Sequence, residues 1–125
     1  MCPIKTFIVE DSPVIRDSLI ATLEELVPVK VVGTAEDEFA AVSWINDPSN
    51  FCDLLIVDIF LKEGSGLGVL RSIHALSKRH KVVVLSNYAT EDIRRKSFEL
   101  GADRVFDKSN EIDALISYCK ELPDD

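Results

Sequence analysis

The chain has 125 residues, of which 46% are hydrophobic and 29% charged, the size and composition of one globular domain with a buried core. Its formal net charge is −8, and an acidic surface repels nucleic acid and anionic lipid. We therefore expect no direct nucleic-acid binding and no attachment to a membrane surface.

The first half of the chain contains two apolar runs, each followed by a segment of helical period. After the run Phe7-Ile8-Val9, Ser12 suits the N-cap of a helix and Pro13 its first position. One face of this helix carries Ile15, Leu19, Leu23 and Leu26. The second run, Val29 to Val32, precedes a helix that begins after Asp37 and ends at Asp47-Pro48. Its inward face is predicted to carry Phe39, Val42 and Ile45.

The second half repeats this alternation three times. The run Leu54 to Val57 precedes a helix predicted over residues 67–77. The run Val82 to Leu85 precedes a helix that Thr90 caps and that Gly101 ends in a left-handed conformation. The run Val105-Phe106 precedes a last helix with the apolar stripe Ile112, Leu115, Ile116 and Cys119.

None of the five runs alternates between apolar and polar residues, which indicates strands that are covered on both faces of a parallel sheet. Right-handed crossovers then give a doubly wound (βα)5 α/β sandwich of three layers. We expect the flavodoxin-like strand order 2-1-3-4-5 and a single domain over residues 1–125.

The cysteines and the N-terminal sequence indicate the cellular compartment of the protein. Cys2, Cys52 and Cys119 form no Cys-x-x-Cys pair and have no histidine at ligand spacing, which favours free thiols over a zinc site. The first residues lack the apolar core of a signal peptide, and the longest apolar run is too short to span a bilayer. These features predict a cytoplasmic protein.

Polar residues follow four of the five strands, at the edge where such sheets bind ligands. They are Glu10-Asp11, Asp58, Ser86-Asn87 and Asp107-Lys108. Two carboxylates about 4 Å apart repel by about 4 kcal/mol at an effective dielectric of 20, so clustered acids here require a cation. Oxygen ligands in small number suit Mg²⁺. Capping of the first helix by Glu10 and Asp11 is the alternative, but it leaves Asp58 unexplained.

Lys108 and Ser86 complete this set of polar residues. A lysine at the ligand edge can pair with Asp58 and later with a phosphoryl oxygen. The hydroxyl of Ser86 can donate a hydrogen bond to a phosphate, although a role as an ordinary strand-end cap also fits its position.

This pattern resembles the response-regulator receiver family of two-component signalling. The matching segments are Phe7 to Ser12, Leu55 to Asp58, Gly64 to Leu67, Val83 to Tyr88 and Gly101-Ala102-Asp103 through Lys108. The resemblance implies that Asp58 accepts a phosphoryl group from a histidine kinase or phosphotransfer protein. It also implies that Glu10, Asp11, Asp58 and the backbone carbonyl of Phe60 hold Mg²⁺. Ser86 would contact the acyl phosphate, and Lys108 would neutralise one of its oxygens.

The sequence departs from the family pattern at three places. Leu61-Lys62 replaces the usual Met-Pro after the phosphorylated aspartate, and Ser109 stands where a cis proline commonly follows the lysine. The switch aromatic, normally three residues before the lysine, is Val105 here. Tyr88 and Phe106 are the candidates for its role.

Two further surface features have open interpretations. Phe60 and Tyr88 flank the site and either obstruct the hydrolytic water or only pack its rim. The run Arg94-Arg95-Lys96 is either a solvated face or a docking patch for a downstream protein or for a phosphorylation-dependent dimer.

The sequence therefore predicts a phosphorylation-activated signalling switch that acts through protein contacts and catalyses only its own phosphotransfer and autodephosphorylation. A receiver fragment of a longer DNA-binding response regulator is the alternative. A phosphatase of haloacid-dehalogenase type would need an acid where Phe60 stands. A flavodoxin-like electron carrier would need a phosphate loop where Glu10-Asp11 would repel the phosphate.

Overall fold

Strands and helices alternate along the chain in the computed structural model, which describes residues 3–75 and 80–122. The strands are β1 (Ile4–Val9), β2 (Val29–Ala35), β3 (Leu54–Val57), β4 (Lys81–Ser86) and β5 (Arg104–Asp107). The helices are α1 (Pro13–Leu26), α2 (Glu38–Asn46), α3 (Gly66–His74), α4 (Glu91–Glu99) and α5 (Ile112–Glu121).

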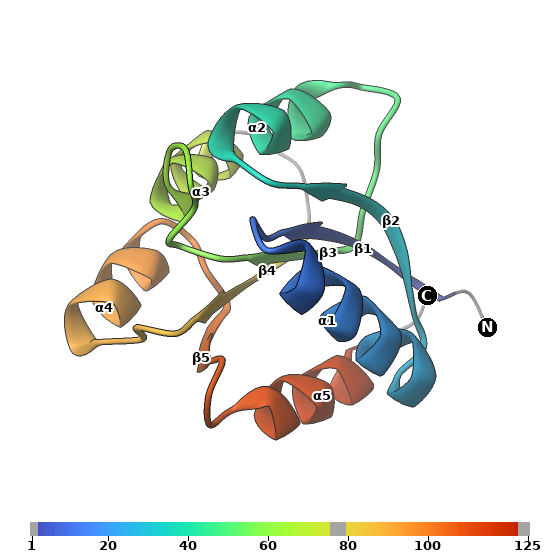
Figure 1. The fold of residues 1–125 in the computed structure, drawn as a ribbon. Coiled ribbons are helices and arrows are strands. Elements are labelled where there is room, and N and C mark those ends of the chain that lie inside the picture. The colour runs from blue at the N-terminus through green and yellow to red at the C-terminus, as the bar shows by residue number, and fades with distance from the viewer. Residues whose placement is uncertain (1–2, 76–79, 123–125) are drawn as a thin grey trace.

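The five strands form one parallel sheet of order β2-β1-β3-β4-β5 (Figure 1). Helices α1 and α5 cover one face, and α2, α3 and α4 cover the other. All four residues of β3 are buried, as unalternating apolar runs predict for a central strand. The expected doubly wound, flavodoxin-like sandwich is confirmed.

The register of the sheet fixes where the functional residues lie. Val57 of β3 pairs with Val9 of β1 on one side and with Val84 of β4 on the other. The backbone N–H of Asp58 donates to the carbonyl of Val9 at 3.0 Å. The N–H of Lys108 donates to the carbonyl of Ser86 at 3.0 Å. The residues that follow β1, β3, β4 and β5 therefore meet at one edge of the sheet.

The predicted helix signals act as expected at three places. The side chains of Ser12 and Thr90 accept hydrogen bonds from the third residues of α1 and α4, and Gly101 has a φ of +97°. Helix α3 begins at Gly66, one residue before the predicted start, and the predicted end at Ser77 lies outside the described residues.

The apolar faces predicted for the first two helices are partly wrong. Helix α2 buries Ala41 and Ile45, whereas Phe39 is 82% exposed. Phe39 precedes Ala41 by two residues, which is about 200° around a helix of 3.6 residues per turn, so both cannot face the sheet. In α1, Leu19 and Leu23 are buried, but Ile15 and Leu26, near its two ends, are 40% and 50% exposed.

The described residues contain no cis peptide bond, so the backbone is trans at Ser109. Cys52 and Cys119 are buried and form no disulfide, whereas Cys2 lies outside the described residues. Within the described part of the chain, no helix has the length and hydrophobicity needed to cross a membrane.

Candidate functional site at the carboxyl edge of the sheet

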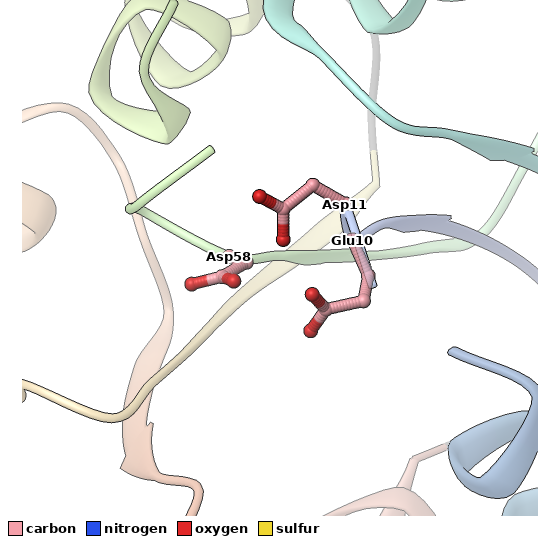
Figure 2. Close-up of side chains that lie close together, drawn as sticks. All are labelled: Glu10, Asp11 and Asp58. Carbon is pink, nitrogen blue, oxygen red and sulfur yellow. The ribbon is translucent and has the colours of Figure 1, made fainter. Parts of the chain in front are cut away.

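Three acidic side chains converge beyond the ends of β1 and β3 (Figure 2). Glu10, Asp11 and Asp58 each offer a carboxylate oxygen, and these atoms all lie within 4.8 Å of one another. Glu10 and Asp58 are buried and Asp11 is half-buried. The cluster that the strand-end pattern predicted is therefore present in the structure.

Lys108, which follows β5, reaches into this cluster. Its Nζ donates to Oδ2 of Asp58 at 2.9 Å and also to Oε1 of Glu10. Only 9% of the lysine side chain is exposed. The pairing with Asp58 confirms the sequence-based expectation, and the bond to Glu10 adds a second carboxylate partner.

Burial and ion pairing act in opposite directions on these groups. Burial raises the pKa of the Glu10 carboxyl above its ordinary value, against the lowering effect of Lys108 and of the Ser12 N–H. Burial alone would lower the pKa of Lys108, but hydrogen bonds to Glu10 and Asp58 outweigh it, and the net direction is upward. Lys108 is therefore held as an ammonium ion inside the site.

Backbone groups orient the two buried acids. Oε2 of Glu10 accepts from the N–H of Ser12 at 3.1 Å, so Glu10 contacts the start of α1 as well as Lys108. Oδ1 of Asp58 accepts from the N–H of Phe60 at 3.3 Å. The helix-capping interpretation of Glu10 is thus compatible with its place in the cluster.

A pocket of about 120 Å³ opens over the carboxylates, lined by Glu10, Asp11, Ser12, Ile15, Asp58, Phe60, Asn87, Tyr88 and Lys108. Ser86 is fully buried at the end of β4, and its Oγ accepts from the N–H of Tyr88 at 3.1 Å. The next residue, Asn87, lines the pocket in its place. Contact between the Ser86 hydroxyl and a phosphoryl group stays a prediction.

Two aromatic rings form part of the pocket rim. Phe60 and Tyr88 meet edge to face, with their ring centroids 5.4 Å apart, and they are 49% and 65% exposed. At the position where the family carries its switch aromatic, Val105 is buried on the side of the sheet covered by α2, α3 and α4. Phe106 is buried on the opposite side.

The structure also shows two interactions that the sequence did not indicate. Arg94 of the basic run is bonded inside the molecule, to two backbone carbonyls and to Glu111. Glu38 of α2 accepts a hydrogen bond from Ser65, in the loop after Asp58. No local pattern marks these residues as special, because Val105 and Glu111 lie 11 and 17 residues from Arg94 and Ser65 lies 27 residues from Glu38.

The donor set fits a divalent ion. Three carboxylates and one ammonium leave two negative charges uncompensated at the site. Carboxylate oxygens are the ligands that Mg²⁺ takes, and Mg²⁺ retains several of its waters in such sites. The residues present therefore match the chemistry of a magnesium centre that is open to solvent on one side.

Comparisons with known proteins agree with this geometry. The sequence profile of the response regulator receiver domain matches residues 6–120. The phosphate regulon transcriptional regulatory protein PhoB of Klebsiella pneumoniae is 31% identical over 122 residues, covering 94% of this chain and 51% of that protein. A protein-glutamate methylesterase/protein-glutamine glutaminase of Myxococcus xanthus is 30% identical over 107 residues, covering 85% of this chain and 30% of that protein. The chain thus spans about half or less of the length of these relatives.

Solved structures match over nearly the whole chain. The receiver domain of the response regulator NarL from Mycobacterium tuberculosis superposes with a TM-score of 0.80 at 20% identity, covering 96% of this chain and 98% of that one. The phosphorylated cyanobacterial phytochrome response regulator RcpA gives a TM-score of 0.77 at 29% identity, covering 94% and 89%.

Proposed function

The chain belongs to the response regulator receiver domain family of two-component signalling, and we propose that Asp58 is the residue that accepts the phosphoryl group. One observation carries this assignment. Asp58 is a buried carboxylate that lies among two further acids and is bonded to the ammonium of Lys108. Among the acids of this cluster it is the one that directly follows the central strand β3.

The chemistry of the transfer follows from this arrangement. An oxygen of Asp58 attacks the phosphorus of a phosphohistidine on a histidine kinase or phosphotransfer protein. A P–O bond forms, the P–N bond breaks, and the electron pair leaves with the imidazole nitrogen. The product is an acyl phosphate on Asp58. Positioning and charge neutralisation carry most of the catalysis in such transfers.

Each neighbouring residue has a role in this proposal. Lys108, already bonded to Asp58, neutralises a phosphoryl oxygen, and the hydroxyl of Ser86 donates a hydrogen bond to another. Glu10, Asp11, Asp58 and the carbonyl of Phe60 would hold Mg²⁺. When bound, that ion supplies positive charge to the phosphoryl oxygens.

The donor protein needs a surface beside Asp58 on which to dock. A groove of about 380 Å³ runs from Lys108 between α1 and the start of α5, and its lining includes Val14, Ile15 and Leu19. Val14 is 80% exposed and lies in this groove with Ile15 and Leu19, so the groove presents a small apolar surface next to Lys108. We assign this groove to the phosphodonor.

The same membership supports the other parts of the proposal. In this proposal, residues 1–125 form a single domain that catalyses only its own phosphotransfer and dephosphorylation. The domain acts in the cytoplasm and signals by binding a downstream protein. Because the chain spans about half of PhoB, a receiver part of a longer DNA-binding regulator remains the second candidate.

The test is intact-mass analysis after incubation with a small phosphodonor, with Mg²⁺ or with a chelator. We expect one phosphoryl group on the wild type in Mg²⁺, none in chelator and none on Asp58→Ala. Asp17→Ala, which removes an exposed acid of α1, is the matched control and should label normally. Labelling of Asp58→Ala, or none of the wild type, would overturn the assignment.

A further inference from the structure

The loop between β3 and α3, residues 58–65, is folded back on itself beside the acceptor. Phe60 and Ser65 form an antiparallel bridge across it, and the N–H of Gly66 donates to the carbonyl of Ile59 at 2.9 Å. The loop carries Phe60, whose N–H bonds to Asp58. The shape of this loop therefore bears directly on the geometry of the site.

A single residue of α2 holds the loop from outside. Oε1 of Glu38 accepts from the N–H of Ser65 at 2.9 Å, and the N–H of Glu38 donates to the carbonyl of Glu63 at 3.3 Å. The side chain of Glu38 thus accepts a hydrogen bond from the loop, and its backbone N–H donates one to the loop. Because Ser65 is also the N-cap of α3, the carboxylate lies at the positive end of that helix, where negative charge is favoured.

Two glycines make room for this carboxylate. A Cβ built on Gly68 would overlap the carboxyl group of Glu38, and one on Gly64 would overlap its Cβ. Gly64 also has a φ of +78°, which side-chain-bearing residues rarely adopt. The position of Glu38 and the absence of side chains at residues 64 and 68 are therefore complementary.

From these contacts we propose that Glu38 is a positioning residue for the acceptor, which fixes the loop that carries the Phe60 backbone. Glu38 does not touch Asp58 in this proposal. It acts through Ser65 and Phe60, and its effect on phosphorylation rests on the function proposed above. The bond needs an acceptor oxygen at this position, and the negative charge of the carboxylate adds a favourable interaction with the start of α3.

The first test compares Glu38→Ala with Glu38→Gln, which retains a side-chain oxygen acceptor. Amide hydrogen exchange of residues 59–65 in metal-free protein should quicken by about tenfold in Glu38→Ala, as the loss of one hydrogen bond to a charged group allows. Titration with Mg²⁺ alone should show weaker binding in the same variant. Glu38→Gln, which keeps the acceptor oxygen but not the charge, should restore most of both values, and Glu25→Ala, at an exposed site of α1, should change neither.

The second test uses Gly68→Ala, which leaves Glu38 in place but displaces its carboxyl group. This variant should reproduce the faster loop exchange of Glu38→Ala, and combining the two should add nothing further, because both remove the same contact. If Glu38→Ala does not fold, Gly68→Ala alone carries the comparison with wild type.

The outcomes separate this inference from the proposed function. Unchanged loop exchange in Glu38→Ala, or fully additive effects in the double variant, would overturn the role of Glu38 even if Asp58 is phosphorylated. Failure of wild-type phosphorylation with altered loop exchange would instead overturn the assignment of Asp58 and leave the contact between Glu38 and the loop in place.

Discussion

At the scale of single residues, Lys108 combines a structural role, the pairing of buried acids, with the chemical role proposed for it at the site. Its ammonium bonds two carboxylates whose side chains are 3% and 8% exposed. Buried charges are tolerated when they are paired, and removal of one partner leaves the others uncompensated. In addition to the role proposed for it in phosphoryl transfer, Lys108 therefore compensates the charge of two buried acids before any ligand binds.

Lys108→Met is accordingly expected to lower the free energy of unfolding by about 3 kcal/mol in metal-free protein. Added Mg²⁺ should recover part of the loss, because it supplies positive charge to the same acids. Urea unfolding with and without Mg²⁺ measures both values, and Lys120→Met, at an exposed site of α5, is the control. Equal losses with and without Mg²⁺ would contradict this account.

The aromatic rim gives a second prediction at this scale. Phe60 and Tyr88 meet beside the pocket, where they can hinder the water that hydrolyses the acyl phosphate. Phe60→Asn and Tyr88→Ala should each speed dephosphorylation by about three- to tenfold, which corresponds to roughly 1 kcal/mol in the barrier. Loss of phosphoryl label over time measures the rate. Unchanged rates would mean that the rings only pack the rim.

At the scale of elements, Arg94 joins the parts of the chain that surround α4. Its guanidinium donates to the carbonyl of Ala89 at 3.0 Å, to that of Val105 at 3.0 Å and to Glu111 at 2.8 Å. The same Glu111 oxygen accepts from the N–H of Asp107 at 2.9 Å. Arg94 therefore connects the loop after β4 with β5 and the start of α5, and this member of the basic run is bonded within the molecule.

Replacing Arg94 by alanine should destabilise the protein by about 1–2 kcal/mol, because three hydrogen bonds from a charged group are lost at a partly exposed site. Arg95→Ala should change stability by no more than about 0.5 kcal/mol, as expected for a surface substitution, because Arg95 is 63% exposed. Chemical unfolding of the two variants makes the comparison, and similar losses would show that Arg94 has no special structural role.

The same ion pair predicts a pH dependence. The hydrogen bond from Arg94, with that from the Asp107 N–H, holds the pKa of the Glu111 carboxyl below its ordinary value of 4.5. A group with a lowered pKa in the folded state stabilises the protein above its ordinary pKa, and the contribution is lost as the pH falls through the folded value. Stability of the wild type should therefore fall more steeply below about pH 4.5 than stability of Arg94→Ala. Parallel acid profiles would contradict this.

For the whole molecule, the sheet could be predicted because the residue pattern of each strand by itself indicates that the strand is covered on both faces. Runs such as Leu54 to Val57 are apolar without alternation, and burial on both faces is their direct consequence. The strand order then placed Glu10, Asp58 and Lys108 at one edge. These steps need only periodicity and topology, so they could be made without coordinates.

Beyond the pairing of Lys108 with Asp58, the choice of side-chain partners could not be predicted in this way. Lys108 and Glu10 are 98 residues apart in the chain, and Ser65 and Glu38 are 27 apart. Periodicity says which face of a helix is apolar, but not which surface carboxylate reaches a backbone N–H of another element. Phe39 shows the same limit, because a large apolar residue near a helix start was assigned to the core and lies in solvent.

The charge of the whole molecule leads to the last prediction, which concerns metal binding and stability. The chain carries a formal charge of −8, and two uncompensated negative charges are concentrated at the acidic cluster. An ion that binds only the folded state stabilises it by mass action, by about 2.7 kcal/mol at one hundred times its dissociation constant. Mg²⁺ should therefore raise the midpoint of thermal unfolding, and NaCl at matched ionic strength should raise it less.

Asp11→Asn distinguishes binding at this site from general screening of the acidic surface. Asp11 is half-buried at the rim of the cluster, so its substitution spares the core while it removes one carboxylate from the donor set. The variant should lose most of the Mg²⁺-dependent shift, whereas Asp113→Asn, at an exposed site of α5, should retain it. Equal Mg²⁺-dependent shifts of the unfolding midpoint in both variants would mean that Mg²⁺ acts by general screening of the acidic surface. Binding at a specific site must depend more on a ligand of that site than on a distant acid of the same charge.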